Sequence, residues 1–302
     1  MMMRSGSIST VWITAIILIL LGGATGLLFE IERQRPAAHR ALELQYLPKG
    51  DYLRVAVLGY RELAADLIWL KVVQHFGERK PVQAGLKWAY HAVEVVTDLD
   101  PRFVMAYRAA GTVLGVWGGQ VRDSIALLVK GMRHNPQAWE LPFLIGYDYF
   151  YELCDAAAAA QYFRQASILP GAPEYLPRLA ARMTVEGGDP DAAIEFLVRF
   201  SQRTPDERLR EALRQRIKEV IAERDLRVLE DAAGRYAASF KVPPASLADL
   251  VTAGIVSAIP PSPFEGSHYE WSPREGRVVN SGLRERLHVH RRVTCRVPEQ
   301  IG

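Results

Sequence analysis

The chain has little cysteine and no recognisable catalytic motif, and both shortages limit what it can be. Its 302 residues include two cysteines, Cys154 and Cys295, too few for a disulfide framework or a four-cysteine metal site. Cys154 lies in an apolar helical stretch, which predicts a buried, inert thiol; a bridge to Cys295 is the alternative. The sequence contains no phosphate-binding GxxxxGKS/T loop, no GxSxG nucleophile elbow, no HExxH zinc motif and no CxxCH haem motif. We therefore predict that the protein is not an enzyme, with no catalytic residue, no metal and no cofactor.

The chain also has little net charge, and one N-terminal segment has no charged residue. The formal net charge is +3, and acidic and basic residues alternate along most of the chain, which argues against a nucleic-acid partner. No charged residue occurs between Arg4 and Glu30. Residues 8–29 form an apolar run long enough to cross the hydrocarbon core of a bilayer, which takes about 20 residues. Residues 1–30 are therefore predicted to be an N-terminal transmembrane anchor.

A cleaved signal peptide is the competing interpretation of this run, because small residues such as Ala24 and Gly26 lie near a possible cleavage site. The apolar run continues beyond that site to Phe29, which favours a retained, single-pass anchor. Its orientation is not settled by the flanking charges. Arg4 favours an inside amino terminus, whereas the basic residues after the run, Arg33, Arg35 and Arg40, favour the opposite. We expect an inner-membrane protein whose soluble part lies in the periplasm, since a soluble domain after such an anchor is commonly exported.

Residues 31–51 are predicted to be a juxtamembrane spacer, and residues 52–76 a single amphipathic helix. Asp66 interrupts the apolar face of that helix. A buried charge is costly unless it is paired or hydrogen-bonded. We expect Asp66 to bond to a neighbouring helix; a contact with a partner protein is the alternative.

Proline recurs at a near-constant interval in the next part of the chain. Pro101, Pro136, Pro170 and Pro205 are separated by 35, 34 and 35 residues, and two helix-like stretches lie between successive prolines. Small and aromatic residues recur with the same period, as at Gly111, Gly146, Tyr149, Ala158, Tyr162 and Ala181. This pattern resembles the helix–turn–helix repeat of tetratricopeptide repeat (TPR) proteins. Over residues 52–205 the resemblance implies a TPR-like α-solenoid, and the segment at 58–70 resembles the first helix of membrane-anchored bacterial TPR proteins.

Ligands of TPR proteins generally lie on the concave face, which is lined by the first helix of each repeat. Carried over to this chain, the resemblance implies these partner-binding candidates: Met105, Arg108, Thr112, Glu140, Phe143, Tyr147, Phe150, Tyr175, Arg178 and Arg182. Arg108, Arg178 and Arg182 are the candidates for receiving a carboxylate from an acidic peptide tail. The alternative is that they are ordinary solvated positions on a helix face.

The sequence pattern of the C-terminal third differs from that of the repeats. Residues 206–240 are predicted to be a long capping helix, and residues 241–302 a small α+β module with a β-hairpin at His268–Trp271 and Arg277–Val279. A helix ending near Tyr236, a Pro–Ser–Leu turn, a short helix, a Pro–Phe loop and a hairpin resemble the globular end of type II secretion major pseudopilins. The chain has no Asp after Asp249, so the calcium site of those proteins is not expected. The tail 287–297 is predicted to add an edge strand, and its histidines, His288 and His290, to be surface residues.

Together these features predict a mostly α protein: a transmembrane helix, a TPR-like α-solenoid and a small C-terminal α+β module. The expected function is a membrane-anchored scaffold that binds proteins or peptide tails during assembly of an envelope complex for secretion, pilus formation or transport. The alternative is an envelope enzyme with an unrecognised site in the groove or in the C-terminal module.

Overall fold

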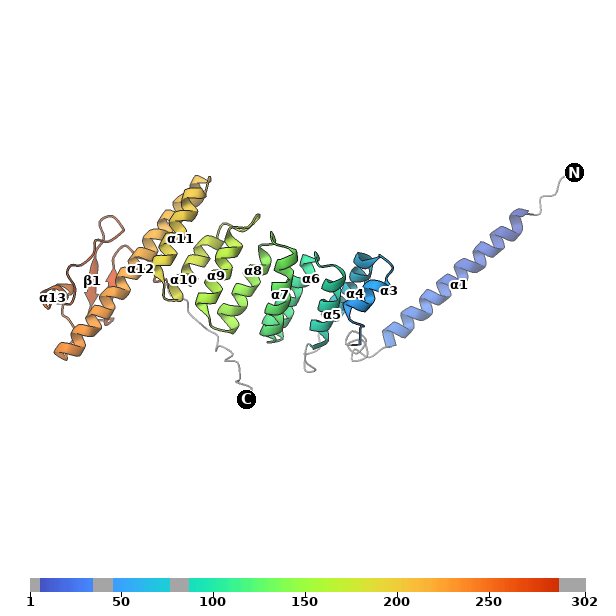
Figure 1. Cartoon of the computed structure of the whole chain (residues 1–302), viewed down its shortest axis with the longest axis horizontal. Helices are drawn as coiled ribbons and strands as arrows, with labels where there is room; N and C mark the ends of the chain where they lie inside the picture. Colours follow the sequence, from blue (N-terminus) through green and yellow to red (C-terminus); the bar gives the residue numbers. More distant parts are fainter. Residues whose placement is uncertain (1–5, 35–45, 77–86, 288–302) are drawn as a thin grey trace. The chain divides into compact units, whose positions relative to one another are not determined.

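The computed structural model describes residues 6–34, 46–76 and 87–287, and these residues are mostly helical, with one two-stranded antiparallel sheet (Figure 1). This confirms the predicted mostly α fold with a small hairpin. The chain divides into two compact units, residues 1–100 and 101–302. The boundary falls inside the region that the sequence assigns to repeats, 52–205.

The first unit begins with α1 (Gly6–Gln34), whose apolar side chains are exposed. The exposed set comprises Trp12, Ile16, Ile17, Leu18, Ile19, Leu20, Leu21, Leu27, Leu28 and Phe29. Within the described residues, no helix combines the length and the hydropathy that crossing a membrane requires.

The rest of the first unit is a cluster of three helices: α3 (Gly50–Ala56), α4 (Arg61–Phe76) and α5 (Lys87–Leu99). The prediction of one helix over 52–76 is wrong, because the chain turns between α3 and α4. Leu58 and Gly59 have φ angles of 47° and 96°, a left-handed conformation that an α-helix cannot contain. The apolar spacing continues across this turn, so the pattern alone did not reveal the break. The cluster is closed by Arg54, which donates hydrogen bonds of 2.9 and 2.6 Å to the Asp98 carbonyl.

Helix α4 buries a narrower face than its sequence predicts. Ala65 and Val72 are fully buried against α5, but larger side chains of this helix are exposed: Leu63, Leu67 and Leu70. Asp66 is also exposed, and no bond from it to a neighbouring helix is found in the described part of the chain. The expected hydrogen bond is therefore wrong, because the charge of Asp66 is met by solvent.

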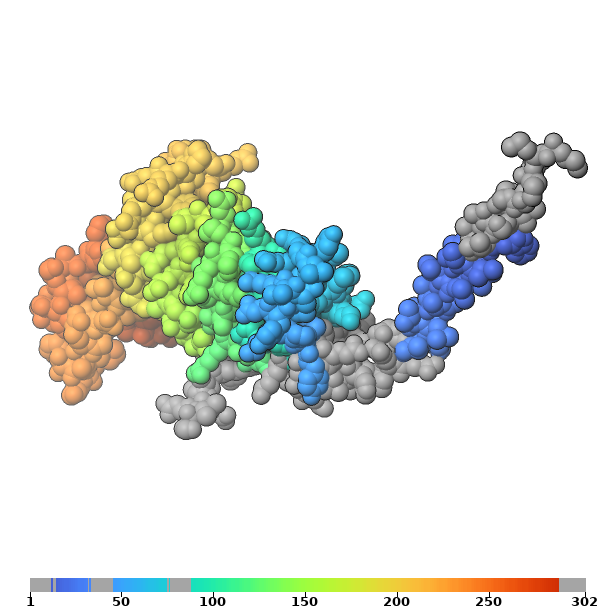
Figure 2. Space-filling view, turned by 45° about the vertical axis from the view of Figure 1, so that its right-hand side comes forward, coloured from blue at the N-terminus to red at the C-terminus, as the bar shows by residue number. Residues whose placement is uncertain are grey.

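The second unit begins with three pairs of helical segments that follow each other in chain order (Figure 1). The first pair is α6 (Val104–Ala110), continued by a π-helix η1 (Gly111–Trp117), and α7 (Val121–His134). The second is α8 (Glu140–Tyr147), continued by a π-helix η2 (Asp148–Glu152), and α9 (Ala156–Ser167). The third is α10 (Leu176–Glu186) and α11 (Pro190–Arg203). Each segment packs against its neighbours along the chain, and side chains fill the spaces between them (Figure 2).

The pair boundaries follow from local chemistry. Pro136 and Pro170 lie in the connections between pairs, and the turns within the second and third pairs end in an aspartate cap. Asp155 accepts a 2.8 Å bond from the Ala158 amide, and Asp189 accepts a 2.9 Å bond from the Ala192 amide, with Pro190 at the first helical position. An aspartate followed directly by proline is a sequence signal for a helix start, and Asp189 and Pro190 have these positions at the start of α11.

The small positions of the pattern are sites of close packing. A Cβ added to Gly146 would lie 2.8 Å from the Phe163 ring, and Ala181 is fully buried. Tyr149 and Tyr162, two aromatic positions of the pattern, are stacked with ring centroids 5.5 Å apart. These residues let one helix pair approach closely and fill the space beside it.

The C-terminal part is built on α12 (Glu207–Phe240), the predicted long helix, which begins at the Asp206 cap. It is followed by α13 (Leu247–Thr252) and by strands β1 (Tyr269–Ser272) and β2 (Arg277–Asn280). The strands pair antiparallel, with Tyr269 opposite Asn280, which confirms the predicted hairpin. An apolar core joins the hairpin and α13 to the second half of α12, through Leu226, Leu229, Leu250, Tyr269 and Val278.

Two buried polar contacts join this part further. Asp225 of α12 accepts a 3.0 Å hydrogen bond from the Tyr269 hydroxyl. Glu223, which is 2% exposed, receives Arg286 at 2.8 Å and Arg227 at 3.1 Å. Burial alone would raise the pKa of Glu223, but the two guanidinium groups hold it below its ordinary value.

One cysteine expectation is wrong. Cys154 is disulfide-bonded and half-buried at the turn between η2 and α9, so it is not an inert free thiol. The chain's other cysteine, Cys295, lies outside the described residues, as do the predicted edge strand, His288 and His290.

Candidate functional site

The first predicted partner-binding residues pair with each other. Arg108 of α6 and Glu140 of α8 form an ion pair of 3.4 Å between consecutive helix pairs. Thr112 is turned to its own helix, with its hydroxyl donating to the Arg108 carbonyl at 3.1 Å. Arg108 is partly exposed, but a partner's carboxylate would have to compete with Glu140. Arg108 is thus a weaker candidate for that role than the sequence suggests.

The aromatic candidates have different surroundings. Phe150 is 3% exposed in a core with Phe163 and Met183, so it cannot touch a partner without repacking. Phe143 packs on the same core and is partly exposed. Tyr147 lies against Tyr151, with ring centroids 4.5 Å apart. Burial is the main reason that the pKa of Tyr147 is raised.

The last candidates lie on or next to α10. Tyr175 is exposed, and Arg178 and Arg182 are half-buried. Both arginines interact electrostatically with Arg216 of α12, a residue that the sequence did not single out. Burial lowers the pKa of Arg216, the carboxylate of Glu219 at 2.9 Å opposes this, and the charges of Arg178 and Arg182 lower it further. The structure therefore brings two predicted residues into an arginine cluster.

A buried carboxylate lies between the two π-helices. Asp148, at the start of η2, is 1% exposed, and its Oδ2 accepts a 2.6 Å hydrogen bond from Ser124 of α7. A Cβ added to Gly115 of η1 would lie 2.5 Å from Asp148 Oδ1, so only glycine admits the carboxylate there. Burial raises the pKa of Asp148 to about 7, although the Ser124 hydrogen bond opposes the shift. The sequence did not predict this contact, which joins three separate helical segments.

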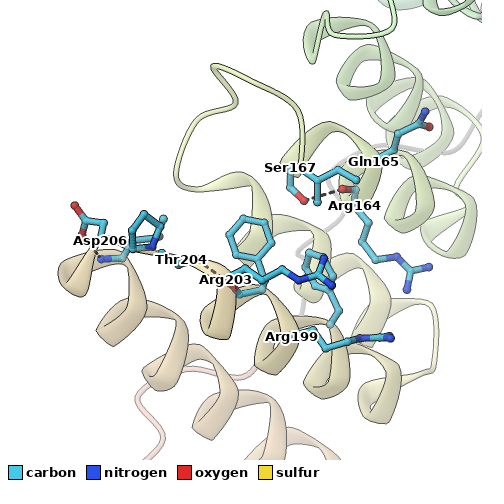
Figure 3. Close-up of a pocket in the computed structure, with 12 residues that line it drawn as sticks. Arg164, Gln165, Ser167, Arg199, Arg203, Thr204 and Asp206 are labelled. Carbon is cyan, nitrogen blue, oxygen red and sulfur yellow. Dashed lines mark hydrogen bonds between the residues drawn. The ribbon is translucent and has the colours of Figure 1, made fainter.

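The surface of the second unit includes an apolar groove of about 720 Å³ (Figure 3). It runs between α9, α11 and the turn that begins α12. Phe196 and Phe200 of α11 line it, with ring centroids 5.8 Å apart, as does Leu209 of α12. Ile168, at the end of α9, is 68% exposed at its edge. We call this surface the α9–α11 groove.

Three arginines surround the α9–α11 groove. Figure 3 shows Arg164 on α9 and Arg199 and Arg203 on α11. Arg199 is paired with Glu195 at 3.1 Å, one turn away on the same helix. Arg164 and Arg203 form no side-chain ion pair with any residue that the structure describes. The groove is therefore apolar at its base and positively charged at its edge, which suits a ligand with apolar and acidic groups.

Sequence reasoning missed this groove for an identifiable reason. Phe196 and Phe200 are four residues apart, a spacing that is equally typical of a buried helix face. The TPR resemblance also directs attention to the first helix of each repeat, whereas α9 and α11 are second helices. The exposed Ile168 beside Arg164 was a usable signal, since it places an apolar side chain next to a basic one at a helix end.

Comparisons of this chain with protein-family models, with curated proteins and with solved structures found no match. Function is therefore argued from the surfaces described above.

Proposed function

We propose that this protein is a membrane-attached helical scaffold that binds a partner protein in the α9–α11 groove. The observation that carries the proposal is an open groove lined by two aromatic rings, Phe196 and Phe200. Beside them lie Arg164 and Arg203, which form no ion pair with any acidic residue in the described part of the chain. An amphipathic segment with acidic residues complements both properties: its apolar side chains cover the two rings, and its carboxylates pair with the guanidinium groups.

The scaffold belongs, in this proposal, to the TPR-like solenoids. Three helix pairs in chain order, with prolines in the connections and glycine or alanine at the close contacts, support that assignment. Each pair packs mainly on its neighbours, as the repeats of a solenoid do. The pseudopilin-like character of the C-terminal part stays a prediction based on the order of its elements.

Membrane attachment through α1 is part of the proposal, with the second unit in the periplasm. Its support is the row of exposed apolar side chains along α1, which water solvates poorly. The disulfide bond of Cys154 supports an oxidising compartment, because disulfides persist there and are rare in the cytosol. In such an envelope location the partner would be a component of a secretion, pilus or transport complex.

Peptide selection tests the binding proposal. The full-length chain in detergent is immobilised and a random 16-residue peptide display library is selected on it. We expect recovered peptides that combine acidic with aromatic or aliphatic residues, and binding that falls at least about tenfold in an Arg164→Gln, Arg203→Gln double variant. Arg133→Gln, an exposed arginine of α7 outside the groove, is the matched control. Recovered peptides without acidic residues, or equal binding to both variants, would contradict the proposal.

Protease treatment of intact spheroplasts tests the location. With an epitope placed after Gly302, we expect digestion from outside. Protection until lysis would place the second unit in the cytoplasm. Carbonate extraction of the same membranes tests α1: full-length chain should stay in the pellet, and chain lacking 6–34 should be released.

A further inference from the structure

Helix α4 of the first unit has apolar side chains on two opposite faces. Ala65 and Val72, seven residues apart, are fully buried on the face that packs against α5. Leu63, Leu67 and Leu70 lie on the other face and are 56%, 57% and 57% exposed. A helix that is apolar all round is normally covered on every side. The outer face of α4 is therefore apolar without contributing to the core of its own unit.

The exposed residues follow the heptad repeat of a coiled coil. Tyr60, which is 70% exposed, directly precedes α4 and is in phase with it, because its carbonyl accepts a 3.1 Å hydrogen bond from the Ala64 amide. The buried Ala65 and Val72 both fall at position f, which faces away from the apolar seam of such a repeat. Successive positions a, d, a and d form what we call the α4 seam: Tyr60, Leu63, Leu67 and Leu70.

Two charged residues flank the α4 seam. Asp66 is at position g, and Lys71 is at position e of the following heptad. Both are exposed, and neither forms an ion pair with another residue in the described part of the chain. In a parallel pair of helices, position g of one copy lies beside position e of the next heptad of the other copy. A parallel pair would thus form two Asp66–Lys71 ion pairs, whereas antiparallel packing would bring like charges together.

We infer that a second copy of this chain covers the α4 seam, and that the two α4 helices pair in parallel. A second copy is the occupant because the seam complements itself: one two-fold axis matches the leucines with their counterparts and each Asp66 with a Lys71. Two heptads are too short to hold free helices together. Helix α4 is already ordered by its packing on α5, so association does not include the cost of forming it. The inference does not depend on the function proposed for the α9–α11 groove.

Photo-crosslinking between tagged copies tests this inference. A benzophenone amino acid is placed at Leu67 of the full-length chain, and two forms with different epitope tags are expressed together and irradiated in the cell. We expect an adduct with the mass of two chains that carries both tags. If position 67 instead gives only adducts with lipid, with another protein or within one chain, the inference is overturned.

Charge exchange makes the test specific for parallel pairing. Asp66→Lys and Lys71→Asp each place like charges at both g–e contacts, so each variant alone should give at least about fivefold less adduct. Expressing the two variants together restores opposite charges across the seam and should restore the adduct. Glu62→Lys makes the same charge change at an exposed position of α4 outside the seam and should have no effect.

These variants change exposed side chains, so they leave the packing of α4 on α5 intact. An adduct that Asp66→Lys does not reduce would overturn the inference. A mixed pair of variants that gives as little adduct as either variant alone would also overturn it.

Discussion

Asp148 makes the stability of the second unit depend on pH. Its pKa is about 7 in the folded chain, compared with 3.8 for an unperturbed aspartate. The folded state therefore binds a proton more tightly than the unfolded state does. The contribution of Asp148 to the free energy of unfolding is fully present below pH 3.8 and is lost as the pH rises through 7. At about 1.4 kcal/mol per pKa unit, the loss approaches about 4 kcal/mol by pH 8.

Replacing Asp148 by Asn tests this reasoning, because the amide has nearly the same shape and never ionises. Its Oδ1 can still accept the hydrogen bond from Ser124. We expect Asp148→Asn to exceed the wild type in stability by about 1.5 kcal/mol at pH 5 and by about 4 kcal/mol at pH 8, because the wild type loses stability over the whole range from pH 3.8 to 7. Urea unfolding of the full-length chain in detergent, followed by tryptophan fluorescence at both pH values, measures the difference.

Asp231→Asn is the matched control, since Asp231 is an exposed aspartate on α12. It should change the unfolding free energy little at either pH. If Asp148→Asn loses as much stability between pH 5 and pH 8 as the wild type does, the carboxylate is not held protonated by burial, and the reasoning is refuted.

Three further predictions concern packing and ion pairs. Gly146→Ala should lower the free energy of unfolding by about 1–3 kcal/mol, because its Cβ would lie 2.8 Å from the Phe163 ring; thermal melts check this. A Cβ added to Gly234 of α12 would have no atom within 4 Å outside the local helix backbone, so Gly234→Ala should instead raise the free energy of unfolding by about 0.5–1 kcal/mol. Equal effects of the two changes would contradict the packing account. Arg286→Met should lower the free energy of unfolding by about 3–5 kcal/mol, because it leaves Glu223 buried without its main partner. Hydrogen exchange in β1 and β2 should become faster. Adding Glu223→Leu to this variant should recover much of the lost free energy. No recovery in the double variant would show that the pair is not the source of the loss.

Local signals predicted much of the fold. Asp189 followed by Pro190 fixed the start of α11, and the stretch from Pro205 to Phe240 was recognisable as one long helix. The hairpin followed from two short strand-like segments and the turn between them. In each case the determining residues lie within a few positions of each other, so the sequence carries the information directly.

The errors arose where a contact joins distant residues or where a break leaves the apolar spacing unchanged. The turn at Leu58 and Gly59 interrupts no hydrophobic periodicity, so a single helix was expected there. The close approach of Asp148 in η2 to Gly115 in η1 joins residues that lie 33 positions apart in the sequence. The disulfide of Cys154 likewise could not be inferred from two cysteines without a recognisable spacing.

The candidate sites were likewise predictable only in those parts that local sequence determines. The sequence identified Arg178 and Arg182, but their neighbour Arg216 comes from a helix that was assigned a capping role alone. Phe196 and Phe200 had the spacing of core residues, and their place in the lining of a groove depends on residues of α9 and of the start of α12 that lie far from them in the sequence. The sequence indicated which residues could bind carboxylates. Which of these residues lie together in one site is visible only in the packed helices.

Photo-crosslinking in cells tests the central claim, that the α9–α11 groove holds a partner protein, most directly. A benzophenone amino acid is placed at Ile168, at the edge of the groove, and at Arg133, outside it, in the full-length chain. We predict a discrete protein adduct from position 168, none from position 133, and loss of the adduct when Arg164 and Arg203 are both replaced by Gln. An adduct that persists in the double variant, or the absence of any adduct at position 168, would contradict the account.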